Sequence, residues 1–112
     1  MDKTTQEKIG KLQLMEQQLQ QFALQKQQFQ TQLFEIESAI TESAQTTKAY
    51  KIVGNIMIAA DKEELKKELT QKKDIASLRI KTIEKQENKI KDEAKSIQEE
   101  VMGQMKNTEK TK

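Results

Sequence analysis

Apolar side chains recur every seven residues along the first half of the chain, in two series offset by three residues. The series are Leu12, Leu19, Leu33 and Ile40, and Met15, Phe22, Phe29 and Ile36. This is the spacing of the a and d positions of a coiled-coil heptad. Residues 11–49 contain neither Gly nor Pro, so nothing there interrupts a helix. We therefore expect a helix over about residues 5–46 with a narrow apolar seam.

The same periodicity returns in the second half of the chain, with more charge between the apolar positions. These positions are Leu69, Ala76, Ile83, Ile90 and Ile97, with Ile80, Ala94 and Val101 in a second series. Asp61 is a favourable N-cap residue, and Gly103 can end a helix. We expect a second helix over about residues 61–105, followed by a disordered polar tail over residues 107–112.

A short stretch rich in β-branched residues separates the two predicted helices. Gly54 and Asn55 lie at its centre, and Gly tolerates the positive φ that tight hairpin turns demand. We expect a β-hairpin over about residues 50–59, with Val53 opposite Ile56 and Ile52 opposite Met57. The alternative is that this stretch continues the first helix, which Gly-Asn opposes.

Both faces of such a hairpin would be mostly apolar, and a lone two-stranded hairpin is marginal in water. Its two strand edges would also be open to pairing. We therefore predict that hairpins from several chains join into a larger sheet or barrel. The predicted interface residues are Tyr50, Ile52, Val53, Gly54, Ile56, Met57 and Ile58.

Two helices of similar length joined by a short hairpin are expected to fold back on each other. The fold class predicted is mostly α: an antiparallel two-helix coiled coil with one β-hairpin, forming a single domain over residues 1–112. A parallel homodimer through both helices, with the hairpin as a kink, is the alternative. It is disfavoured by the nearly equal lengths of the helices.

The composition excludes several classes of function. The chain has no Cys and no His, so no zinc or copper site and no Ser-His-Asp or Cys-His nucleophile is expected. A Gly-rich phosphate loop is missing, so we expect neither an enzyme nor a cofactor. The 20 basic and 18 acidic residues alternate in sign, which is not the basic face of a nucleic-acid binder.

Membrane association is not expected either. No stretch approaches the ~18 apolar residues of a membrane span, and the first residues do not form a signal-peptide core. The first predicted helix is rich in Gln and lacks the strongly basic face of a membrane-surface helix. We expect a soluble, cytoplasmic protein.

The run Tyr50-Lys51-Ile52-Val53-Gly54-Asn55-Ile56 resembles the hairpin signature of the prefoldin beta class. The segments 60–65 and 79–87 are similar to the archaeal beta subunits of that family, and the likeness covers roughly residues 8–105. The resemblance implies a hetero-hexamer of two alpha-type and four beta-type subunits, whose hairpins form a double β-barrel. It further implies an ATP-independent chaperone that holds unfolded clients and passes them to a group II chaperonin.

In an antiparallel coiled coil, the start of the first helix and the end of the second lie together at one tip. The apolar residues there are the predicted client-binding set: Ile9, Leu12, Met15, Ile97, Val101, Met102 and Met105. Flexible Met side chains suit surfaces that accept many partners. We expect roughly half of Leu12, Met15, Ile97 and Val101 to be ordinary seam residues. Ile9, Met102 and Met105 lie off the seam or beyond it and are expected to be the better client contacts.

Lys26 occupies a seam position, and Glu87 interrupts the second seam. Glu87 could face Lys26, and a polar residue at such a position often specifies register. Pairing about the Gly54-Asn55 turn would instead place Lys26 nearer Ile83, so we favour the alternative in which both charged side chains extend into solvent without pairing. A structural coiled-coil adaptor without client binding remains the alternative function. Suppression of aggregation of a denatured protein without ATP would separate it from a chaperone.

Overall fold

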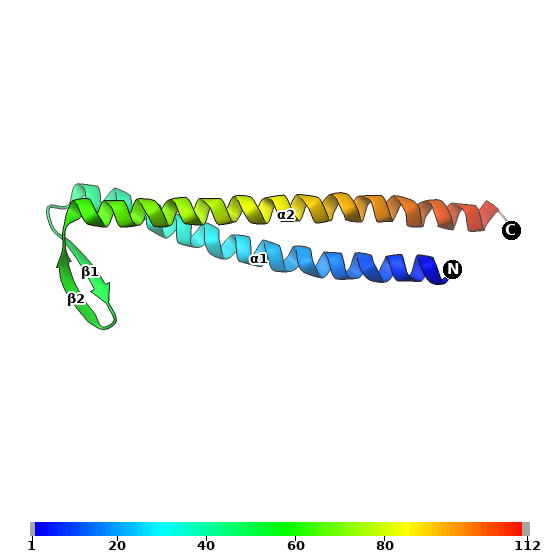
Figure 1. The fold of residues 1–112 in the computed structure, drawn as a ribbon, viewed down its shortest axis with the longest axis horizontal. Helices are drawn as coiled ribbons and strands as arrows, with labels where there is room; N and C mark the ends of the chain where they lie inside the picture. The colour runs from blue at the N-terminus through cyan, green and yellow to red at the C-terminus, as the bar shows by residue number, and fades with distance from the viewer. Residues whose placement is uncertain (1, 111–112) are drawn as a thin grey trace. The chain divides into compact units, whose positions relative to one another are not determined.

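The computed structural model describes residues 2–110, with side chains to residue 106. Helix α1 spans Lys3–Gln45, strand β1 spans Ala49–Val53, strand β2 spans Ile56–Ala60 and helix α2 spans Lys62–Lys110 (Figure 1). Two long helices joined by an antiparallel β-hairpin were expected, and this fold is confirmed.

Helix α2 continues past its expected end at about residue 105. Residues 107–110 of the predicted disordered tail are helical, and residues 111–112 lie outside the described residues. Gly103 lies within the helix and does not end it. A helical Gly costs only about 1 kcal/mol relative to Ala, and the strong helix formers around it can offset that cost.

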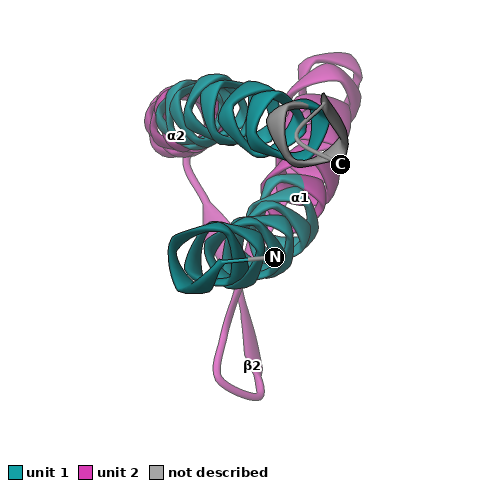
Figure 2. Ribbon diagram, turned by 90° about the vertical axis from the view of Figure 1, so that its right-hand side faces the viewer, with its two compact units in different colours: residues 1–26, 82–112 teal, residues 27–81 magenta. Residues whose placement is uncertain are grey.

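The chain divides into two compact units, which Figure 2 colours separately. Unit 1 contains residues 1–26 and 82–112, and unit 2 contains residues 27–81. Within unit 1 an ion pair joins Lys8 to Glu100, and another joins Lys26 to Glu87. Lys26 follows Lys8 along α1, whereas its partner Glu87 precedes Glu100 along α2. The two helices therefore run antiparallel in unit 1, as expected.

The seam of each unit follows the heptad read from the sequence. In unit 1 the buried apolar side chains are those of Met15, Ile83 and Val101. In unit 2 they are those of Ala76 and Ile80. A two-helix seam shields only a narrow stripe, so most of the predicted a and d residues are half-buried.

The hairpin has the expected register, with Val53 opposite Ile56 and Ile52 opposite Met57. Gly54 has a φ of 62°, and no non-Gly residue in the described chain has a positive φ. A positive φ at only the first central residue is the pattern of a type II′ turn. Asp61 then caps α2 as predicted, because its Oδ1 accepts a hydrogen bond from Glu63 N at 3.2 Å.

Candidate functional site

The apolar side chains of the hairpin in unit 2 are exposed on both faces. The predicted interface side chains range from 47% exposed for Ile58 to 68% exposed for Ile52. The sheet of unit 2 contains only β1 and β2, so each strand has an unpaired edge. Exposed apolar faces with open edges are the features that invite pairing with further strands.

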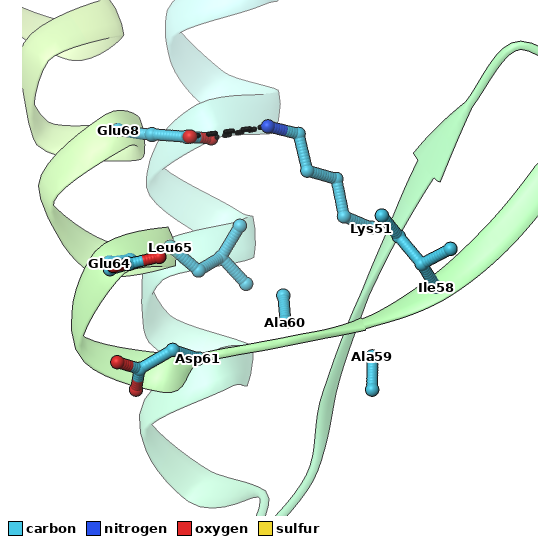
Figure 3. Close-up of a pocket in the computed structure, with 8 residues that line it drawn as sticks. All are labelled: Lys51, Ile58, Ala59, Ala60, Asp61, Glu64, Leu65 and Glu68. Carbon is cyan, nitrogen blue, oxygen red and sulfur yellow. Dashed lines mark hydrogen bonds and ion pairs between the residues drawn. The ribbon is translucent and has the colours of Figure 1, made fainter.

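Two lysine side chains connect elements of unit 2: Lys51 joins the hairpin to α2, and Lys62 joins the start of α2 to the end of α1. Lys51 Nζ on β1 lies 3.1 and 3.0 Å from the two carboxylate oxygens of Glu68 on α2 (Figure 3). Lys62 Nζ donates to the carbonyl oxygens of Ala44 at 3.3 Å and Thr46 at 2.5 Å. Lys62 thereby satisfies carbonyl groups where α1 ends, a position at which a cation is favourable.

A hollow of about 240 Å³ separates the hairpin from the first turns of α2. Its lining includes Ile58 from β2, Leu65 and Glu68 from α2, and Lys51 from β1. Figure 3 shows Lys51 spanning this hollow to reach Glu68. The ion pair and the hollow together define one side of the hairpin as the side directed at α2.

The other candidate site is the tip of unit 1, where α1 begins and α2 approaches its end. The seam closes there with a polar contact, because the buried Thr5 hydroxyl donates a hydrogen bond to Gln104 Oε1. Asp2 Oδ1 accepts a hydrogen bond from Thr5 N at 2.7 Å and so caps α1. Hydrogen bonding with Thr5, through its side chain first and its backbone N–H second, lowers the pKa of Asp2.

The predicted client-binding residues fall into two groups around this polar closure. Met15 and Val101 are buried in the seam, and Ile9, Leu12 and Ile97 are half-buried. Met102 is 59% exposed and Met105 is 46% exposed. Within the predicted set, the exposed side chains are therefore those of the two methionines of α2, while Ile9 is more shielded than its position off the seam suggested.

The expectation that Lys26 and Glu87 do not pair is wrong. Lys26 Nζ lies 2.8 Å from Glu87 Oε1, and Glu87 is buried. Helical side chains lean toward the N-terminus of their own helix. In an antiparallel pair, Lys26 therefore leans past the level of Ile83 and Glu87 leans back to meet it. The hydrogen bond with Glu87 raises the pKa of Lys26.

Sequence reasoning missed several exposed apolar residues and polar contacts. Leu14, Leu24 and Phe34 of α1 are 61%, 59% and 70% exposed. Their signal was available, because each is a large apolar residue off the heptad. The pairing of Lys51 with Glu68 lay beyond sequence reasoning, because it depends on how the hairpin turns against α2.

Neither a membrane segment nor a metal site is apparent among residues 2–110. None of the helices described is long and apolar enough to cross a membrane. The described part of the chain also contains no group of three acidic, His or Cys residues placed to hold a metal ion.

Comparison with known proteins gives consistent matches along the chain. A family model described as "Prefoldin subunit" matches residues 6–108. A prefoldin subunit beta of Archaeoglobus fulgidus is 36% identical over 96 residues, which cover 83% of this chain and 83% of that protein. A prefoldin subunit beta of Sulfurisphaera tokodaii is 44% identical over 55 residues, which cover 49% of this chain and 44% of that protein.

A solved structure agrees with the fold. The crystal structure of the prefoldin beta subunit from Thermococcus strain KS-1 matches with a TM-score of 0.87 and 28% identity. The match covers 91% of this chain and 92% of that chain. The two long helices and the intervening hairpin are therefore shared over nearly the full length of both chains.

Proposed function

Because the chain belongs to the prefoldin subunit family, we propose that it is the beta-type subunit of an ATP-independent holdase. The resemblance noted in the sequence is confirmed, and with it a chaperone subunit that is not an enzyme. The subunit joins alpha-type subunits in a hetero-hexamer of two alpha and four beta chains. The complex holds unfolded proteins in the cytoplasm and delivers them to a group II chaperonin.

The observation that carries the holding function is the exposure of Met102 and Met105 beside a seam closed by polar groups. Both methionine side chains lie on the outside of the tip, where an unfolded chain can reach them. Burying one such side chain contributes about 1.5–3 kcal/mol at most. Several tips acting on one client would give useful avidity.

The hairpin supports the assembly. Its exposed apolar faces and unpaired edges in unit 2 are unfavourable in an isolated subunit and are covered when hairpins from several subunits combine. A barrel closed in this way has no free edges. The hairpin, through part of its predicted interface residues, is therefore our proposal for the contacts between subunits.

The test compares two methionine substitutions with a matched control at the other helix. Met102→Ser with Met105→Ser removes the apolar tip surface, whereas Leu24→Ser removes an equally exposed side chain of unit 1, since Met102 and Leu24 are both 59% exposed. In a hexamer reconstituted with an archaeal prefoldin alpha-type subunit, we expect the double variant to lose most suppression of aggregation without ATP. The Leu24 variant should keep it.

Equal suppression by all three proteins would show that clients bind elsewhere than at Met102 and Met105. An intact hexamer in which even the unsubstituted chain suppresses no aggregation would favour the structural adaptor over the holdase.

A further inference from the structure

The two faces of the hairpin differ in charge. In the observed register, Tyr50 pairs with Ala59 and Ile52 pairs with Met57, and these four side chains form what we call the uncharged face. The opposite face carries a cation, and we call it the lysine face: Lys51, Val53, Ile56 and Ile58. Both faces are mostly apolar, so the residue types alone do not decide which face forms an interface. The surroundings of each face decide it.

The surroundings of the lysine face are set by α2. Lys51 forms its ion pair with Glu68 on that helix, and Ile58 lines the hollow between the hairpin and α2 with Leu65. Ile58 is also the least exposed of the large apolar side chains on the hairpin, at 47%. Figure 3 shows Lys51 extending toward α2 across this hollow. The uncharged face consequently points away from α2.

A closed sheet has an inner face and an outer face, and the inner face forms its core. Helix α2 follows β2 after the single residue Asp61, so it has to lie outside any barrel that β2 enters. The face directed at α2 is then an outer face. Moving Lys51 into the core instead would strip it of water and of Glu68, which is strongly unfavourable.

We propose that the uncharged face, anchored by Tyr50, Ile52 and Met57, is the surface that packs against the hairpins of partner prefoldin subunits. The lysine face stays outside the barrel, held by Glu68. The surface that packs against it is the uncharged hairpin face of a partner subunit. A charged surface would find no ion-pair partner on the uncharged face. This assignment rests on the proposed hexamer and adds which half of the hairpin forms its core.

The unpaired edges and Tyr50 fit this arrangement. The open edges of β1 and β2 lie in the plane of the sheet, so strands of neighbouring subunits can pair there while the uncharged face turns inward. Tyr50 stands near the start of β1, far from the turn, where an aromatic ring can enter the core while its hydroxyl reaches water.

The experiment uses two isoleucines that differ in face but hardly in exposure. Ile52 on the uncharged face is 68% exposed, and Ile56 on the lysine face is 65% exposed. Each full-length variant, Ile52→Asp or Ile56→Asp, is co-expressed with an archaeal prefoldin alpha-type subunit and examined by native mass spectrometry. We expect Ile52→Asp to lose the hexamer at least tenfold and Ile56→Asp to keep most of it.

A second measurement avoids the introduced charge. The chain has no Cys, so Ile52→Cys or Ile56→Cys provides a single thiol whose reaction with N-ethylmaleimide can be located on this chain by mass spectrometry. In the assembled complex, the thiol at position 52 should react at least tenfold more slowly than in the isolated subunit. The thiol at position 56 should react at a nearly unchanged rate.

Each outcome decides between the alternatives. Protection of both positions, or of position 56 alone, would overturn the assignment of faces while leaving the hexamer intact. Failure of the unsubstituted chain to assemble with the alpha-type subunit would overturn the proposed hexamer, and the face assignment with it.

Discussion

Lys26 and Glu87 form an ion pair within the apolar seam of unit 1. The Nζ–Oε1 distance is 2.8 Å, and the Glu87 side chain is only 8% exposed, whereas that of Lys26 is 27% exposed. A buried pair of this kind contributes less to stability than well-packed apolar side chains would, because both charges lose water. Its best attested role in coiled coils is to specify register and partner.

Replacing the pair by Lys26→Leu with Glu87→Leu should therefore leave the isolated subunit at least as stable as before. The cost should appear in specificity, because a continuous apolar seam also fits a second copy of the chain. We expect an equal or higher melting temperature together with new homo-oligomers in native mass spectrometry. A single homogeneous species in the double variant would contradict the register role.

The matched control is Glu87→Leu alone, which leaves Lys26 in the seam without its carboxylate. We expect the melting temperature to fall by several degrees, because an unpartnered cation cannot be accommodated there as well as in water. A double variant that melts as low as this single variant would show that packing and not charge controls the site.

The raised pKa of Lys26 predicts a dependence on alkaline pH. A group whose pKa is higher in the folded state contributes stability that is fully present below its unfolded pKa, about 10.4 for Lys. That contribution is lost as the pH rises through the folded value. The difference in unfolding free energy between the unsubstituted chain and Lys26→Met should be constant near neutral pH. It should decrease only when the pH rises above the unfolded pKa of Lys.

The lowered pKa of Asp2 predicts the opposite dependence at the tip. Its contribution as the cap of α1 is present above the unfolded pKa, about 3.9, and is lost as the pH falls through the folded value. Hydrogen exchange should show that protection of the Thr5 amide decreases in acid. In Asp2→Asn, which keeps a capping oxygen without a charge, this acid-dependent decrease should be absent.

The pairing of Lys51 with Glu68 predicts a charge-swap effect on assembly. Lys51→Glu alone places two carboxylates together and should turn the lysine face away from α2, which reduces the yield of hexamer. Combining it with Glu68→Lys should restore most of that yield. Both side chains are more than 40% exposed, and exposed pairs contribute only about 0.2–1 kcal/mol, so circular dichroism melting should change little in any of these variants.

Gly54→Ala should weaken the hairpin by about 1–2 kcal/mol, because a left-handed conformation is unfavourable for residues with a Cβ. The glycine has a φ of 62° and open space around it, so backbone strain is the only cost expected. Gly54→Asn is the control, since Asn tolerates this conformation better. Equal loss of hexamer in both variants would point to contact at the turn and not to its conformation.

The heptad and the Gly54-Asn55 turn were sufficient to predict the fold of this chain. Periodic spacing determines which side of a helix is apolar, and a central Gly determines where two strands reverse. The end of α2 was predicted too early because Gly103 was treated as a stop, although neighbouring helix formers carry the helix to Lys110.

The polar contacts were harder to predict, for a physical reason. A pairing such as Lys26 with Glu87 depends on the lean of side chains between helices, and a register drawn from backbone levels alone misses it by about one turn. Thr5 and Gln104 occupy heptad positions but are polar. A search for periodic apolar residues therefore did not predict the hydrogen bond between them at the tip.

The bonds from Lys62 to Ala44 and Thr46 also bear on how the chain folds as it is synthesised. Residues of α1 leave the ribosome first, yet the cation that satisfies the carbonyls at its end belongs to α2. Until that lysine emerges, α1 has neither this terminal support nor a partner for its seam. The nascent first half of this chaperone subunit is therefore itself an exposed amphipathic segment, which only the later translation of α2 can shield.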